Sequence, residues 1–150
     1  MDHNEIYAYF AGIIDGEGTI SMYYYKRLDR YYLTFEVYNN CPKLIRWLET
    51  NIGGYSRAIT SPSRESKANW KTTYCWRLHN NDSLHVLQSV LPYLVSKKEQ
   101  CEIAIEFKRS YLIRECPVSA ESKEFRKSLY ERMQPLNQRG LKVPPCLPSA

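Results

Sequence analysis

Two carboxylates lie close together in a glycine-rich stretch near the start of the chain. Asp15 and Glu17 alternate with Gly16 and Gly18, directly after an apolar run with helical spacing. Glycines there predict the end of a helix, where carboxylates are unfavourable because the helix dipole is already negative. Carboxylate and carbonyl oxygens gathered at one point favour a hard divalent cation such as Mg²⁺. The stretch is therefore a candidate metal site, with a solvated helix end as the alternative.

The same predicted helix carries a row of small residues on a second face. Ala8, Gly12 and Gly16 recur at every fourth position, and residues four apart share one face of a helix. Small residues allow two helix backbones to approach closely. We therefore expect this row to pack against another helix.

Basic residues are concentrated in the middle of the chain, although the net charge is only +5 over 150 residues. Residues 20–80 carry ten Lys and Arg against four Asp and Glu, whereas residues 1–19 carry four acids and no Lys or Arg. This excess favours a polyanionic partner, with a solvated surface as the alternative. The length suits one compact domain, and no apolar run is long enough for a membrane span, so no membrane partner is expected.

The cysteines carry information about the redox environment. Five of them, at positions 41, 75, 101, 116 and 146, include no Cys-x-x-Cys pair. An odd number without that spacing indicates reduced thiols rather than a disulfide framework or a zinc site. Because no signal peptide is visible either, we expect an intracellular protein, with cytoplasm, organelle and nucleus not distinguished.

The elements that must position the candidate residues follow from the periodicity of the sequence. Asn4 is the expected N-cap of the first helix, and Pro42 is expected to open the second. In order, we expect a helix over residues 4–15, strands over 19–27 and 31–38, a helix over 42–52, strands over 55–61 and 70–79, and helices near 84–91, 97–114 and 119–133. This is an α+β domain over residues 1–134, followed by a proline-rich tail over 135–150.

Alternation in the strands separates a core face from an outward face. Leu33, Phe35 and Val37 point one way and form the core, whereas the intervening positions carry Tyr, Thr and Glu. Such a face can stack, donate and accept, and a two-stranded ribbon fits the DNA major groove; a solvated sheet face is the alternative. The candidate DNA-facing set is Ser21, Tyr23, Tyr25, Arg27, Arg30, Tyr32, Thr34, Glu36, Tyr38, Arg57, Ile59, Lys71, Thr73 and Arg77.

Residues 10–18, Phe-Ala-Gly-Ile-Ile-Asp-Gly-Glu-Gly, resemble the LAGLIDADG motif of homing endonucleases. Phe10 replaces the first Leu and Glu17 the second Asp, and the stretch precedes a predicted strand, as in that family. The resemblance implies an αββαββα core whose four-stranded antiparallel sheet forms a saddle over double-stranded DNA, with additional C-terminal helices. Because the chain has one motif, it also implies a homodimer in which Ala8, Gly12 and Gly16 pack against their own copies.

The resemblance further implies an intron-encoded enzyme that hydrolyses both strands of a long pseudo-palindromic site. Glu17 takes the position of the metal-binding acid, with the Gly16 carbonyl as a further ligand of Mg²⁺ or another divalent cation. Asn39 takes the position that orders the attacking water, and Lys43 and Lys97 take those of two basic residues in the catalytic pocket.

Two other interpretations stay open. A non-cleaving LAGLIDADG protein, acting as an RNA maturase or a transcription regulator, would bind nucleic acid without cutting it. Glu17 argues against this, because loss of cleavage tolerates loss of that carboxylate. An unrelated globular protein with a coincidental match is disfavoured by the element order and by the basic middle of the chain.

Overall fold

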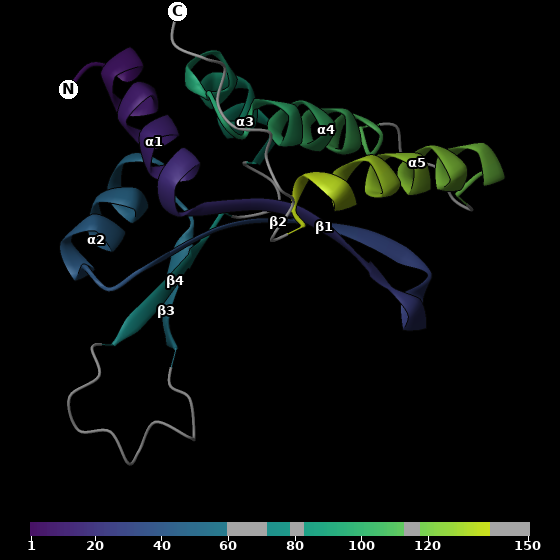
Figure 1. The fold of residues 1–150 in the computed structure, drawn as a ribbon, viewed down its shortest axis with the longest axis horizontal. Coiled ribbons are helices and arrows are strands. Elements are labelled where there is room, and N and C mark those ends of the chain that lie inside the picture. Colours follow the sequence, from purple (N-terminus) through teal and green to yellow (C-terminus); the bar gives the residue numbers. More distant parts are fainter. Residues whose placement is uncertain (60–71, 79–82, 113–117, 139–150) are drawn as a thin grey trace, which may run out of the picture.

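The computed structural model describes residues 1–59, 72–78, 83–112 and 118–138. The elements follow one another in the predicted order (Figure 1). They are α1 (His3–Glu17), β1 (Gly18–Tyr25), η1 (Lys26–Leu28), β2 (Arg30–Asn39), α2 (Pro42–Asn51), β3 (Tyr55–Ile59), β4 (Thr73–Arg77), α3 (Ser83–Val90), η3 (Leu91–Tyr93), α4 (Lys98–Arg109) and α5 (Ala120–Leu136). Lys71 and the expected strand ends at residues 60–61, 70–71 and 79 lie outside the described residues.

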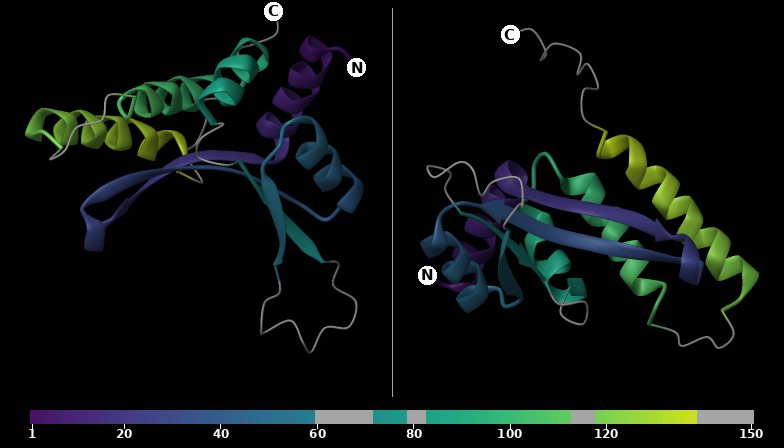
Figure 2. Two further views of the ribbon diagram at one scale, coloured as in Figure 1. Left: turned by 180° about the vertical axis from the view of Figure 1, so that it is seen from behind. Right: turned by 90° about the horizontal axis from the view of Figure 1, so that it is seen from below.

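The four strands form one antiparallel sheet in the order β1-β2-β4-β3. Helices α1, α3, α4 and α5 lie on one side of this sheet (Figure 1). The sheet bends away from them, and its opposite face forms an open arch, which is also visible from behind in Figure 2. The predicted α+β architecture with a four-stranded antiparallel saddle is confirmed. Within the described parts of the chain, no helix has both the length and the apolar character to cross a membrane.

The core lies between the sheet and the helices. Ile20 and Met22 of β1, Phe35 and Val37 of β2 and Trp76 of β4 are buried and join one cluster with the apolar faces of α1, α3, α4 and α5. The predicted inward positions of the second strand are therefore correct, and Leu33 is partly buried against the same cluster.

Three details differ from the prediction. The N-cap of α1 is Asp2 rather than Asn4, because Asp2 and Glu5 form a capping box with two hydrogen bonds of 2.8 Å. Leu112 falls within the helix expected over residues 97–114 and was predicted as one of its apolar positions, but α4 ends at Arg109 and Leu112 is 69% exposed. Pro135, assigned to the tail, lies within α5.

The hairpin of β1 and β2 closes differently from the expected turn. β1 ends at Tyr25, so Arg27 lies in η1 and not in the strand. Asp29 adopts left-handed backbone geometry with φ 48°, and its carboxylate accepts hydrogen bonds from Tyr24 Oη at 2.7 Å and Lys123 Nζ at 2.9 Å. The tip of the hairpin is thus fastened to the first turns of α5.

The outer edge of β1 is covered by the other end of α5. Asn137 Nδ2 donates to the Ile20 carbonyl at 3.0 Å and Gln134 Nε2 donates to the Met22 carbonyl at 3.2 Å. Figure 2 shows α5 running alongside the hairpin. An edge strand exposes unpaired backbone groups, and side-chain amides of α5 satisfy two of those groups here.

Candidate metal centre and nucleic-acid interface

The junction between α1 and β1 places the candidate metal ligand. The helix ends at Glu17, and the Gly18 N–H donates to the Ile14 carbonyl. A Cβ at Gly18 would lie 2.7 Å from Ile14 Cα, so only glycine allows the chain to turn so tightly from helix into strand. Glu17 therefore stands at the point where the helix meets the sheet.

Asp15 holds a loop that comes from far along the chain. Its carboxylate accepts hydrogen bonds from the backbone N–H groups of Val95 at 2.8 Å, Ser96 at 3.2 Å and Lys97 at 3.0 Å, and from Ser96 Oγ at 2.9 Å. Burial raises the pKa of Asp15, but these hydrogen bonds outweigh it and leave the pKa below its ordinary value. Asp15 is thus occupied as a structural acceptor, and the two acids of the motif are not equivalent.

Lys97 supplies the positive charge that the end of α1 requires. Its ammonium donates to the carbonyls of Ile14 and Asp15, both at 2.7 Å, where the helix dipole is negative. Burial lowers the pKa of Lys97, and the negative charges of Asp15 and Glu17 offset part of that effect. The sequence predicted a divalent cation at this helix end; within the protomer, the Lys97 ammonium lies against two of its carbonyls.

Glu17 differs from Asp15 because its carboxylate is exposed and makes no hydrogen bond or ion pair among the described residues. The Gly16 carbonyl belongs to the last turn, whose carbonyls have no partner within the helix. These oxygens suit a hard divalent cation. No group of three or more His, Cys, Asp or Glu side chains that could hold a metal occurs in the described part of one protomer. A metal here would therefore need donors besides the described side chains of one protomer.

Asn39 and Lys43 lie at and just beyond the end of β2. The pairing of Gly18 with Val37 aligns the end of β2 with the start of β1, so Asn39 lies at the same end of the sheet as Glu17. Asn39 Oδ1 accepts from the Cys41 N–H at 2.8 Å, and Lys43 is exposed in the first turn of α2. The structure thus gathers Glu17, Asn39 and Lys97 around one corner of the sheet, with Lys43 on the adjoining helix.

The candidate DNA-facing residues lie on the arch face of the sheet, opposite the helices. Strand pairing places Ser21 beside Thr34, Tyr23 beside Tyr32 and Glu36 beside Arg77. The remaining described members on the same face are Tyr25, Arg30, Tyr38, Arg57, Ile59 and Thr73, whereas Arg27 follows β1 in η1.

The part of this face nearest the hairpin tip is aromatic. Tyr23 stacks on Tyr32 with ring centroids 5.3 Å apart and an interplanar angle of 15°, and Tyr25 meets Tyr32 edge-on at 6.4 Å. Tyr23 and Tyr25 are 47% and 42% exposed. The exposed rings offer stacking surfaces, and Arg30 beside them offers positive charge; nucleic acids bind to both.

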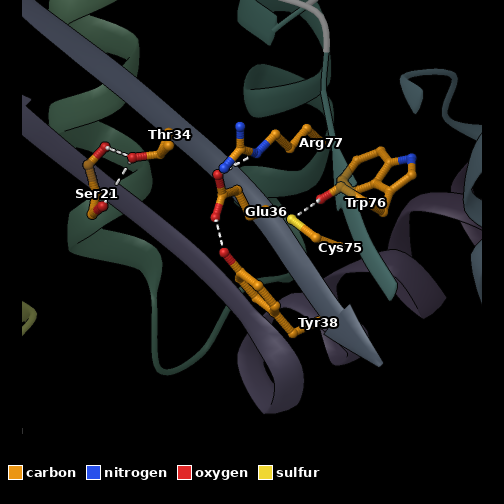
Figure 3. A network of polar contacts seen from close by, with 7 residues as sticks. All are labelled: Ser21, Thr34, Glu36, Tyr38, Cys75, Trp76 and Arg77. Carbon is orange, nitrogen blue, oxygen red and sulfur yellow. Dashed lines mark hydrogen bonds and ion pairs between the residues drawn. The ribbon is translucent and has the colours of Figure 1, made fainter. Parts of the chain in front are cut away.

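The part nearer Glu17 carries a network of polar contacts (Figure 3). Glu36 accepts from Tyr38 Oη at 2.7 Å through one carboxylate oxygen, and its other oxygen forms an ion pair with Arg77 Nε. The Glu36 side chain is only 8% exposed, against 33% for Arg77. The hydrogen bond to Glu36, with burial, raises the pKa of Tyr38 to about 12. Burial of Arg77 lowers its pKa, but the charge of Glu36 raises it above the ordinary value.

Two hydroxyl groups complete this network on the neighbouring strand pair. Ser21 Oγ and Thr34 Oγ1 lie 3.0 Å apart, and Thr34 Oγ1 also donates to the Ser21 carbonyl at 3.2 Å. The alternation of the strands located these residues, but nothing in the sequence indicated that Glu36 would be buried with both oxygens engaged.

No protein-family model matches the chain, and no curated protein matches it. Solved structures of homing endonucleases do match. I-CvuI in complex with its target in the presence of 2 mM Ca has a TM-score of 0.67 at 19% identity, over 93% of this chain and 86% of that chain. I-CvuI with the I-CreI target in 2 mM Mg, with the DNA not cleaved, has the same TM-score and identity over 95% and 88%. The archaeal intron-encoded I-Vdi141I complexed with DNA has a TM-score of 0.73 at 15% identity, over 93% and 89%.

These similarities extend over nearly the whole of each chain compared, and at 15–19% identity they concern the fold. They agree with the α+β fold and its four-stranded antiparallel sheet. The chain therefore has the fold of the LAGLIDADG homing endonucleases.

Proposed function

We propose that the protein is an intracellular, site-specific homing endonuclease. As a homodimer it would bind a long pseudo-palindromic duplex and hydrolyse one phosphodiester bond in each strand, with Mg²⁺ or another divalent cation. The observation that carries this proposal is the contrast at the end of α1. Asp15 and two helix carbonyls are occupied there, while Glu17 is exposed and has no hydrogen-bond partner in the described part of the chain. The DNA complexes formed by I-CvuI and I-Vdi141I support DNA as the substrate.

The homodimer is supported by two glycines that the protomer does not need. Gly12 and Gly16 are exposed on α1, and a Cβ at either position would meet no atom of the described residues within 4 Å. Glycine inside a helix costs about 1 kcal/mol relative to alanine, so their presence needs another reason. Close approach of the same helix from a second copy supplies one, and a two-fold axis there would bring two Glu17 side chains together.

The residues at the junction have distinct roles in the proposed reaction. Glu17 and the Gly16 carbonyl from each copy would hold the cation, which when bound supplies Lewis-acid polarisation and an activated water. Lys97 uses two of its three ammonium hydrogens on α1, and the third would offset charge on the phosphate. Asn39 has its oxygen engaged by Cys41, so its amide hydrogens would orient the attacking water. Exposed Lys43 would add positive charge beside them.

DNA binding would use the arch face of the sheet. Its two-stranded ribbon of β1 and β2 has the dimensions of a major-groove reader, and basic residues along it would neutralise phosphates. Affinity should therefore fall steeply with salt concentration.

The test is selection from a pooled duplex library in Mg²⁺, with Glu17→Gln and a Ca²⁺ reaction in parallel. We expect the wild type to cut both strands of an enriched two-fold site and Glu17→Gln to bind that site without cutting. Glu102→Gln, a change at an exposed position of α4, is the matched control and should cut normally. Binding without cutting by the wild type would favour a DNA-binding module. Enrichment of structured RNA instead of duplex would favour a maturase.

A further inference from the structure

The hydrogen bonds within the arch face restrict which bases it can recognise; this inference rests on the proposed DNA binding. A hydroxyl group has one hydrogen to donate. Thr34 donates its hydrogen to the Ser21 carbonyl, so in the contact between the two hydroxyls Ser21 must be the donor. Both hydrogens are then used inside the protein. The pair presents only lone pairs to the groove and acts as an acceptor.

Arg77 presents the opposite polarity. A guanidinium has five N–H donors and no acceptor. The ion pair with Glu36 engages Nε, and the side chains of Cys75 and Tyr55 are further hydrogen-bond partners of Arg77, so these three partners leave N–H donors for a base. Glu36 is itself fixed through its other oxygen by Tyr38, and its side chain is 8% exposed. Glu36 is therefore placed to orient the fork of Arg77 and not to accept a hydrogen bond from a base. Arg77 is also among the residues that line a cavity of about 690 Å³, which extends from β2 to α3 and α4.

The strand register sets the distance between these two groups. Arg77 pairs with Glu36, which is two residues from Thr34 along β2. Two strand residues span about 7 Å, close to the roughly 6.8 Å that two successive base steps of about 3.4 Å span. Because Val37 pairs with Gly18, Arg77 lies nearer than Thr34 to the end of the sheet that carries Glu17.

We propose that each half-site carries a guanine opposite Arg77 and, about two base pairs farther from its centre, adenine or cytosine opposite Ser21 and Thr34. Guanine offers two acceptors to an arginine fork, whereas adenine and cytosine offer an exocyclic amine hydrogen to an acceptor. Glu36 acts as a positioning residue for Arg77, in place of the direct base contact that alternation of the strand suggested.

Three variants test the proposal in the same library selection, with preference at each base step as the readout. Thr34→Val removes one hydroxyl and frees the Ser21 hydrogen, so preference for adenine or cytosine at the outer step should disappear while the guanine stays. Glu36→Gln should reduce guanine preference at the inner step by about tenfold and leave the outer step unchanged. Arg77→Lys keeps the charge but loses the fork, and it should abolish the guanine preference even if Glu36→Gln folds poorly.

Two controls match these changes. Thr50→Val removes a helix hydroxyl that donates to the Arg46 carbonyl, and Glu102→Gln removes an exposed carboxylate; neither should alter either base step. The inference is wrong if the wild type enriches a site and Thr34→Val and Glu36→Gln select the same bases in it. It is also wrong if that site contains no guanine whose preference is lost in Arg77→Lys. In either case the proposed function stands. If the wild type enriches no duplex at all, the proposed function is wrong and this inference with it.

Discussion

Replacing Gly12 by alanine should have opposite effects on the protomer and on the dimer. The added Cβ meets no atom within 4 Å among the residues that the structure describes, so only the helix propensity is expected to change in the protomer. Alanine stabilises a helix interior by about 1 kcal/mol relative to glycine. For a chain of this length that gain corresponds to about 2–4 °C in the unfolding midpoint. The variant protomer should therefore unfold at a higher temperature than the wild type.

The dimer should weaken because the same methyl group enters the helix contact twice. Overpacking a close contact costs about 1–3 kcal/mol, which corresponds to at least about a fivefold rise in the dimer dissociation constant, and to more if both copies contribute. Sedimentation over a concentration series measures this constant, and urea unfolding at concentrations below it measures the protomer alone. Cleavage of a two-fold site should fall in parallel with dimer formation.

Gly18→Ala provides the contrasting variant. Its Cβ would lie 2.7 Å from Ile14 Cα, so this change should destabilise the protomer itself. A Gly12→Ala protein that dimerises as tightly as the wild type would refute the reasoning. So would a wild-type protein that sediments as a single chain at micromolar concentration.

Three further predictions concern the supports of the site. Asp15→Asn should lower the free energy of unfolding by about 2 kcal/mol, because charge-assisted hydrogen bonds to residues 95–97 are lost. The pKa of Asp15 in the folded protein lies below 3.8. In urea titrations of the wild type, the stabilisation from Asp15 should therefore be present above that pH and lost at lower pH. Burial lowers the pKa of Lys97 below 10.5, so cleavage by the wild type should decline as the pH rises toward that value, and Lys97→Arg should remove the decline. Asn137→Ala should weaken DNA affinity severalfold in a gel-shift titration without contacting DNA, because the edge of β1 loses a support; unchanged affinity would show that the hairpin holds its shape alone.

The order of elements and the two faces of the strands could be predicted because both depend on local periodicity. Phe35 and Val37 are buried and Ser21 lies beside Thr34, as alternation required. The ends of the helices and strands could be predicted less well where contacts between residues far apart in the sequence determine them. The turn at Asp29 depends on Lys123, far along the chain, and no local pattern near residue 29 contains that information.

The candidate site was predictable only in part for the same reason. The spacing of the sequence gives Asp15 and Glu17 the same predicted role. They differ in the structure because the backbone N–H groups of residues 95–97 bind the carboxylate of Asp15. Lys97 was singled out by resemblance, but its contact with the end of α1 spans more than eighty residues of sequence. Glu36 has the same alternation as its exposed neighbours, and its burial depends on the pairing of β2 with β4.

The support of β1 by α5 has a consequence for how such a protein can change over evolution. Gln134 and Asn137 bind backbone carbonyls of β1, not its side chains. This part of the support of the hairpin therefore depends on backbone carbonyl groups, which every amino acid has. Outward side chains such as Tyr23 and Tyr25 can be exchanged without loss of those two bonds, so new targets can be acquired by substitutions on the arch face while the scaffold stays intact.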